Sequence, residues 1–187
     1  LVLGGASRSL LNFRGTLLAS MKSRGHEVVA VAHTDHAAEV SAQLRQRGIE
    51  FIGVPIERTG LNPLKDFKTL LTLRNLFASL SPDVILTYTI KPVIYGLIAA
   101  RWANIESRNG IITGLGYAFS NSSIQQRAVG FIAQSLYRFA LKGANNVFFQ
   151  NPDDQRLFED AGFVSSQNAV LINGSGVDLD YYQPRTL

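Results

Sequence analysis

The sequence of 187 residues contains no cysteine. Disulfide bridges and metal sites built from thiolates are therefore excluded, and this composition is typical of a reducing compartment. Charged residues are also scarce, at 17%, whereas 46% of the residues are hydrophobic. A disordered chain would show the opposite balance, so the composition predicts a folded domain with a large core.

Long apolar segments are missing as well. No run reaches the roughly 18 apolar residues that a membrane-spanning helix needs, and nothing at the start resembles a signal peptide. We therefore expect a cytoplasmic protein. The formal net charge is +4 and the pI is about 9.6, which favours anionic partners. Nucleic acid is the weakest of these, because the basic residues are interspersed with acids and no aromatic platform is evident.

Short β-branched or apolar segments alternate with longer amphipathic ones along the chain. This alternation predicts an α/β fold: a doubly wound, mostly parallel, Rossmann-like sheet of about seven strands. The expected strands are 1–3, 27–32, 50–54, 83–88, 109–113, 146–150 and 169–172. The expected helices are 11–24, 36–47, 63–80, 92–104, 122–142 and 152–161. In the helix at 63–80, the residues at helical spacing are Leu64, Phe67, Leu71 and Leu80.

Two unusual loops follow the first and fourth strands. In a sheet with strand order 3-2-1-4-5-6, ligands bind at the carboxyl ends of these two strands, where the order reverses. The first loop has glycines that allow close approach of a ligand, and it opens a helix whose free amides favour an anion. Its polar side chains are Ser7, Arg8, Ser9 and Asn12. The alternative interpretation is a plain strand-to-helix turn with a serine cap.

The second loop places Thr89 and Lys91 just before a proline-started helix. Lys91 would neutralise a substrate phosphate, and the alternative is a solvated surface lysine. A glycine-rich loop with Gly114 and Tyr117 follows the fifth strand and faces the same edge. It would form a wall for a ligand, although a tight turn explains the glycines almost as well. Tyr88 would either stack on a sugar ring or belong to the core.

Several familiar sites are absent from the sequence. The glycine pair lacks the third glycine of the dinucleotide fingerprint, and no acid ends the second strand at the expected distance. No Gly-Lys-Ser/Thr occurs, which excludes a P-loop. His33 and His36 follow the second strand, but no carboxylate cluster at ligand spacing accompanies them. We therefore expect no metal site.

The segments GGASRSLLNFRG, ERTGLNPLKD, LSPDVILTYTIKPVIYG, ITGLGYAF, FFQNPDDQRLF and INGSGVDLDYY occur in this order. Together they resemble family 4 retaining glycosyltransferases of the GT-B fold, and in particular bacterial enzymes that build capsule, O-antigen or N-glycan precursors on undecaprenyl diphosphate. The resemblance implies an enzyme with two Rossmann-like domains. It would transfer a hexosyl or acetylhexosaminyl residue from a nucleotide-sugar, expected to be UDP-linked, to a lipid-linked glycan, without a cofactor or metal.

The resemblance also implies a division of labour. Residues 1–176 would form the acceptor-side domain, 177–187 would begin the interdomain linker, and the donor-binding domain would lie outside this chain. The domain alone would then be inactive. Gly4 and Gly5 would approach the donor diphosphate. The acceptor would be lined by Asn12, Thr89, Lys91, Gly114 and Tyr117. Many relatives carry a histidine near the position of Gly114, so no catalytic residue is identified.

A lipid-linked acceptor implies peripheral contact with the anionic inner face of the plasma membrane. Basic residues on two predicted helices would supply it: Arg74, or Arg127, Arg138 and Lys142. Two other functions remain open. One is a non-catalytic Rossmann subunit that anchors a separate catalytic chain at the membrane. The other is a nucleotide-dependent oxidoreductase or epimerase, which the missing fingerprint and the absence of a Tyr-x-x-x-Lys pair disfavour.

Overall fold

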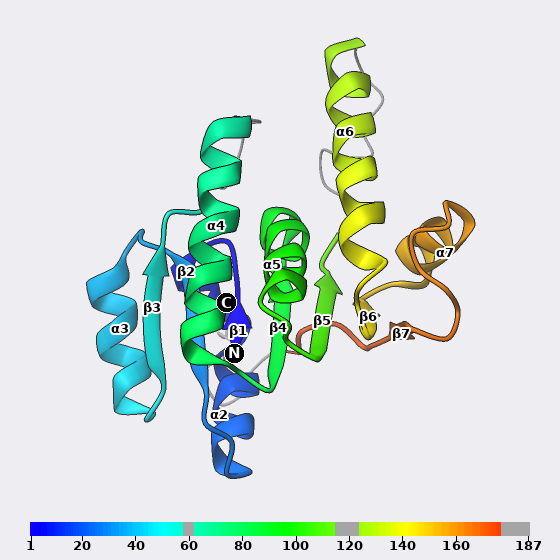
Figure 1. Ribbon diagram of the computed structural model, residues 1–187. Helices are drawn as coiled ribbons and strands as arrows, with labels where there is room; N and C mark the ends of the chain where they lie inside the picture. Colours follow the sequence, from blue (N-terminus) through cyan, green and yellow to red (C-terminus); the bar gives the residue numbers. More distant parts are fainter. Residues whose placement is uncertain (58–61, 115–123, 177–187) are drawn as a thin grey trace, which may run out of the picture.

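The computed structural model describes residues 1–57, 62–114 and 124–176. Within these ranges seven strands form one sheet in the order β3-β2-β1-β4-β5-β6-β7 (Figure 1). All of the neighbouring pairs are parallel. The prediction of a doubly wound, parallel, Rossmann-like sheet is therefore confirmed, including the reversal of strand order between β1 and β4.

The elements alternate along the chain as the sequence predicts. The strands are β1 Val2–Leu3, β2 Val29–His33, β3 Glu50–Val54, β4 Val84–Tyr88, β5 Ser107–Ile112, β6 Asn146–Phe149 and β7 Ala169–Leu171. The helices are α1 Ser7–Asn12, α2 Gly15–Ser23, α3 Ala37–Gln46, α4 Pro63–Leu80, α5 Ile90–Trp102, α6 Ile124–Leu141 and α7 Pro152–Asp160.

The inner strands are largely buried on both faces, which explains their apolar sequences, whereas the edge strands β3 and β7 are partly exposed. Successive side chains of a strand point to opposite faces, so adjacent residues enter different halves of the core. Leu3 and Val31 pack on the face covered by α4, α5, α6 and α7. Val2 and Ala30 pack on the other face, against apolar side chains of α1, α2 and α3. The two turns that follow β1 and β4 are therefore held between two helical layers.

Helices α4 and α7 begin at the residues that the sequence indicates. The side chain of Asn62 accepts a hydrogen bond from the amide of Lys65, and Pro63 occupies the first turn. Asn151 caps α7 in the same way, ahead of Pro152. An asparagine cap followed by proline is a strong helix start, because the cap satisfies a free amide and proline has none to lose.

The predicted helix at 11–24 is instead two helices, α1 and α2, separated at Phe13 and Arg14. Arg14 has φ −124° and ψ −2°, outside the helical range. Arg14 is 4% exposed, with its side chain turned into the protein. A continuous helix would direct this side chain elsewhere. Gly15 begins α2 where a Cβ would lie 2.9 Å from Nη1 of Arg47. Tertiary contacts rather than local propensity thus set this break.

Helix α4 has apolar residues on its outer face as well as its inner one. Leu70, Leu73 and Phe77 are buried in the core, while Leu64 and Phe67 are 84% and 55% exposed. The apolar spacing that indicates the helix in the sequence therefore belongs mainly to its solvent face. Helices α4 and α6 also extend beyond the carboxyl edge of the sheet (Figure 1). Among the described residues, no helix is both long and apolar enough to cross a bilayer.

Candidate functional site

A cavity of about 510 Å³ lies at the carboxyl ends of β1 and β4. Its walls come from the turn after β1, the break between α1 and α2, the turn after β4, and the segments after β6 and β7. These contribute Gly5, Arg14, Thr89, Gln150 and Ser175, respectively. The sequence predicts a ligand site at this reversal of strand order, and the structure brings the two predicted loops together around the cavity.

A second cavity of about 370 Å³ lies at the opposite edge of the sheet, near the amino ends of the strands. Its lining includes Glu27, Glu50 and Asp83. The first cavity is lined by Arg14 and Lys91 but by no aspartate or glutamate among the described residues. The two cavities therefore differ in charge, and only the first lies where doubly wound sheets bind their ligands.

The two glycines after β1 allow the turns that follow β1 and β4 to pack closely. A Cβ on Gly4 would lie 2.7 Å from Cε1 of Tyr88 and closer still to Cζ. A Cβ on Gly5 would lie 2.9 Å from Oγ1 of Thr89. Gly5 lines the cavity, whereas Gly4 lies beneath it, with its amide donating to the carbonyl of Val31 at 2.9 Å. Close packing of protein atoms therefore already requires both glycines.

Tyr88 forms the floor of the cavity. Its side chain is 2% exposed, and its hydroxyl hydrogen-bonds Oγ of Ser9 at 2.8 Å. Burial raises the pKa of Tyr88 to about 12, although the bond to Ser9 and the charge of Arg14 act in the opposite direction. Of the two interpretations that the sequence offers for Tyr88, the structure supports a core residue with one edge at the cavity.

Arg14 is the polar residue that sequence analysis misses. Its guanidinium lies over the ring of Tyr88, 4.8 Å from Cζ to the centroid. Nη1 donates to the carbonyl of Phe13 at 3.1 Å and to Oγ of Ser175 at 2.7 Å, while Nε has no partner. Burial lowers the pKa of Arg14 below its usual value. The sequence suggests Arg8 instead, but that residue is exposed and bonds Glu39 at 2.8 Å.

Thr89 lies between β4 and α5 in an unusual conformation. Its φ of 68° and ψ of 160° place a β-branched residue in a region that is nearly restricted to glycine. Its Oγ1 is buried and has no partner among the described residues. The predicted pocket residue is therefore present at the cavity, with a free hydroxyl and a strained backbone.

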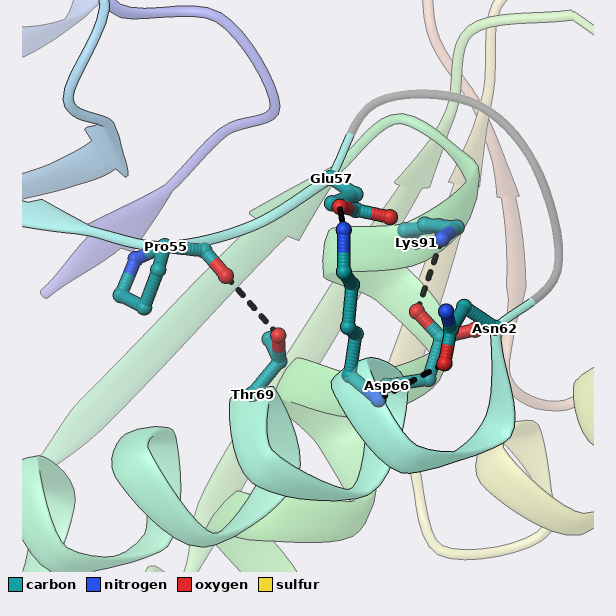
Figure 2. Close-up of polar contacts among 7 residues, drawn as sticks. Pro55, Glu57, Asn62, Asp66, Thr69 and Lys91 are labelled. Carbon is teal, nitrogen blue, oxygen red and sulfur yellow. Dashed lines mark hydrogen bonds and ion pairs between the residues drawn. The ribbon is translucent and has the colours of Figure 1, made fainter.

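Lys91 lines the cavity but is already paired. Its Nζ bonds Oδ1 of Asp66 at 2.8 Å, and both side chains are about nine-tenths buried (Figure 2). The alternative of a solvated surface lysine is therefore wrong. Burial, together with the nearby carboxylate of Asp66, raises the pKa of Tyr95. Since Asp66 neutralises Lys91, this lysine adds little net charge to the cavity.

The start of α4 is fixed against the chain that leaves β3, and this positions Asp66. Thr69 donates to the carbonyl of Pro55 at 2.9 Å, and Lys65 bonds Glu57 at 2.5 Å (Figure 2). The first contact is half-buried and the second is exposed. Within the ERTGLNPLKD segment, the described start of α4 thus brings the buried carboxylate of Asp66 to Lys91.

Ser7, also offered by the sequence as a ligand donor, is occupied by the neighbouring turn. Its amide donates to Oδ1 of Asp35 at 3.1 Å, and its hydroxyl donates to the carbonyl of Asp35. Burial pushes the pKa of Asp35 upward, but the bonds from Ser7 and the nearby His33 outweigh it and lower that pKa. The contact ties the turn after β1 to the turn after β2.

Two further predicted residues, Asn12 and Gly114, do not line the cavity in the described structure. Asn12 ends α1, is exposed and does not line the cavity. Gly114 has φ 140° and is half-buried, and its neighbour Thr113 lines the cavity in its place. Tyr117 lies outside the described residues. The roles expected for these three residues stay predictions.

Comparison with known proteins gives one family match. The model of the family described as "Glycosyl transferase 4-like domain" matches residues 12–174. The chain is also 28% identical, over 182 residues, to N,N'-diacetylbacillosaminyl-diphospho-undecaprenol alpha-1,3-N-acetylgalactosaminyltransferase of Campylobacter jejuni. That match covers 97% of this chain and 47% of the relative, so the chain spans about half the length of the curated relative.

Solved structures share the fold at low identity. A glycosyltransferase from Rickettsia africae superposes with a TM-score of 0.63 at 18% identity, over 100% of this chain and 45% of that one. A UDP-N-acetylglucosamine 2-epimerase superposes with a TM-score of 0.62 at 13% identity, over 90% of this chain and 44% of that one. Because transferases and an epimerase match equally well, these likenesses establish the architecture alone.

Proposed function

The chain belongs to the glycosyl transferase 4-like domain family, and from this premise we propose that it is the acceptor-side half of a retaining glycosyltransferase. The complete enzyme transfers a hexosyl or acetylhexosaminyl residue from a UDP-linked nucleotide-sugar to a lipid-linked glycan. The observation that carries this proposal is the basic cavity between β1 and β4, which lies at the ligand-binding edge of the fold.

The extent of the match supports the proposed domain division. The chain corresponds to 47% of the curated relative, which is the share expected for one of two similar domains. In this proposal residues 1–176 are the acceptor-side domain, 177–187 begin the linker, and a donor-binding domain completes the cleft. The glycine turn then faces the donor diphosphate from the acceptor side, with Gly5 at the cavity and Gly4 packed beneath it.

The proposed acceptor class is supported by the name of that relative, which acts on a glycan linked through diphosphate to undecaprenol. A similar acceptor would bring an anionic diphosphate and an apolar lipid to this domain. Arg14 and the N-terminus of α5 suit the diphosphate, because free helix amides and a guanidinium both bind oxyanions. Stabilising the departing diphosphate of the donor is the main electrostatic task in such a transfer.

The outer face of α4 suits contact with the membrane that holds such a lipid. Leu64, Phe67 and Leu71 are exposed there, and Lys68 and Arg74 are exposed beside them. The acid of this helix, Asp66, is buried. An exposed face with apolar and basic residues and no exposed acid is typical of helices that lie on anionic bilayers.

Helix α6 presents a similar mixture from its middle to its C-terminal end. Phe131, Ile132 and Phe139 are exposed, and Arg138 and Lys142 are exposed near them. The side chain of Arg127, expected to take part, lies outside the described residues. Peripheral attachment through the first turns of α4, where Leu64 and Phe67 are exposed, would leave the cavity beside the bilayer, since this end of α4 extends past the carboxyl edge of the sheet (Figure 1).

The test is sugar transfer by the complete gene product and by the 187-residue chain, with a panel of UDP-sugars and an undecaprenyl-diphosphate-linked acceptor. We expect transfer with retained anomeric configuration by the complete product and none by this chain alone. An epimerase would instead convert the UDP-sugar in the absence of any acceptor. If the complete product performs neither reaction and binds no acceptor, an anchoring subunit for a separate catalytic chain becomes the better proposal.

A further inference from the structure

We propose that Arg14 is an anion-binding residue of the cavity and that, with the hydroxyl of Thr89 and the N-terminus of α5, it binds a diphosphate group. The proposal rests on the function above only for the source of that diphosphate, which is either the nucleotide-sugar or the lipid-linked acceptor. The anion site itself follows from the charges, partners and burial of these residues.

Arg14 carries the uncompensated charge of the cavity. Arg14 is 4% exposed. No carboxylate within the described ranges lies close enough to form an ion pair with it. Lys91, by contrast, is neutralised by Asp66 at 2.8 Å. A buried charge without a partner is costly, so the arrangement is stabilised when an anion enters the cavity.

Two buried polar atoms at this place lack a hydrogen-bond partner. Nε of Arg14 and Oγ1 of Thr89 are buried and have no partner in the described structure. Helix α5, with 13 residues, begins directly after Thr89, and Ile90 and Lys91 line the cavity. The first amides of a helix lack intrahelical acceptors, and they favour negative charge. A guanidinium, a hydroxyl and helix amides form a suitable set for phosphate oxygens.

The guanidinium is also held in place before any ligand binds. It stacks on Tyr88 and donates to the carbonyl of Phe13 and to Oγ of Ser175. Oγ of Ser175 also accepts a bond from Nε2 of Gln150 at 2.8 Å. A planar donor fixed in this way loses little conformational freedom on binding.

The strained backbone of Thr89 supports the same conclusion. A β-branched residue in this region costs of order 1–3 kcal/mol, and here it is located between a strand and a helix at the cavity wall. Such strain commonly occurs where a side chain must be presented to a ligand. The residue that bears it is also the residue with the free hydroxyl.

The test measures binding of inorganic pyrophosphate to the 187-residue chain by titration calorimetry. We expect Arg14→Gln to weaken pyrophosphate binding at least about tenfold, as loss of a charge-assisted pair requires. Arg14→Lys keeps the positive charge but loses the planar guanidinium, so its affinity for pyrophosphate should lie between those of the wild type and Arg14→Gln. Thr89→Val, which keeps the shape and removes the hydroxyl, should weaken binding several-fold.

The matched control is Arg8→Gln, an exposed arginine of the same segment that bonds Glu39; it should bind pyrophosphate like the wild type. Circular dichroism and thermal melting establish that each variant is folded. Repeating the titration with UDP and with a short prenyl diphosphate identifies the source, because the relevant ligand should bind more tightly than pyrophosphate and lose that affinity in Arg14→Gln.

Two results would overturn the proposal. One is equal pyrophosphate affinity in the wild type and in the folded Arg14→Gln and Thr89→Val variants. The other is no binding of pyrophosphate to the wild type at concentrations that saturate phosphate sites. Sugar transfer by the complete gene product would survive either result if the proposed function is correct. If the complete gene product transfers no sugar while the 187-residue chain still binds pyrophosphate, the proposed function is refuted and the anion site is retained.

Discussion

A Cβ atom on Gly4 would lie 2.7 Å from Cε1 of Tyr88 and closer still to Cζ. The ends of β1 and β4 can therefore approach this closely only because position 4 is a glycine, since any larger residue would clash with Tyr88. This contact sets the floor of the cavity, because Tyr88 in turn supports Arg14 and Ser9.

Replacing this glycine should be costly. We expect Gly4→Ala to lower the free energy of unfolding by at least about 2 kcal/mol, since overpacking a rigid site displaces an aromatic ring. Urea denaturation measures the difference. Gly110→Ala is the matched control: it lies in β5, and its Cβ would meet Leu97 and Val93 at an ordinary 3.5 Å. Similar midpoints for the two variants would contradict the close approach of Gly4 and Tyr88.

Removing one member of the buried pair between Lys91 and Asp66 should destabilise the fold strongly. Lys91→Met leaves a carboxylate buried without its cation, which costs roughly 3–5 kcal/mol in comparable sites. The double variant Lys91→Met, Asp66→Leu should recover part of this loss, because no buried charge then remains. Chemical denaturation of the wild type, Lys91→Met and the double variant tests whether the stabilities of the two residues are coupled.

The exposed pair between Lys65 and Glu57 is the control for that experiment. Its side chains are 62% and 39% exposed, and water and salt screen their interaction. Lys65→Met should leave the denaturation midpoint unchanged within error. If Lys91→Met behaves in the same way, the lysine is not held by a buried carboxylate.

Stability should fall as the pH rises from about 10 to about 12. Burial raises the pKa of Tyr88 from 10.0 to about 12 in the folded state, so the folded protein keeps a proton that the unfolded chain loses. The contribution is fully present below pH 10 and disappears as the pH rises through 12. A shift of this size corresponds to about 3 kcal/mol.

Tyr88→Phe should flatten this alkaline decline by a similar amount. Denaturation midpoints measured between pH 8 and pH 12 give the comparison with the wild type. A residual slope is expected in the variant, because burial also raises the pKa values of Tyr95 and Tyr137. Parallel curves for the wild type and Tyr88→Phe would show that Tyr88 does not titrate from a buried site.

The outer face of α4 makes a prediction about vesicle binding. Phe67→Glu places a charge of the wrong sign on an exposed apolar position and should weaken binding to phosphatidylglycerol vesicles several-fold. Leu157→Glu on α7 is the control, since that leucine is also partly exposed but belongs to a helix rich in acidic residues. Equal binding of the two variants in a sedimentation assay would argue against attachment through α4.

The sequence predicts the sheet because short apolar segments alternate with amphipathic ones, and it predicts the strand order because doubly wound sheets usually have that order. It also locates Thr89 and Lys91 at the correct edge. The polar chemistry of the cavity is harder to predict, because it depends on contacts between distant residues. Lys91 meets a carboxylate 25 positions away, and a local pattern does not reveal that partner.

Arg14 illustrates the same limit. The apolar spacing predicts one helix over 11–24, in which Arg14 would be an ordinary surface residue. The helix breaks instead, since Arg14 is stacked on Tyr88 and bonded to Ser175, 161 positions along the chain. The only local signal is the glycine that follows it, Gly15, which weakens a helix at that point.

The most direct measurement of the central claim is the mapping of ligand contacts by amide chemical shifts. A short prenyl diphosphate titrated into the 187-residue chain should perturb the amides around the basic cavity, including Gly5, Arg14, Thr89 and Ile90. Amides around the acidic cavity near Glu27 and Glu50 should not move. Perturbations centred on the acidic cavity, or none at saturating ligand, would contradict the assignment of the site between β1 and β4.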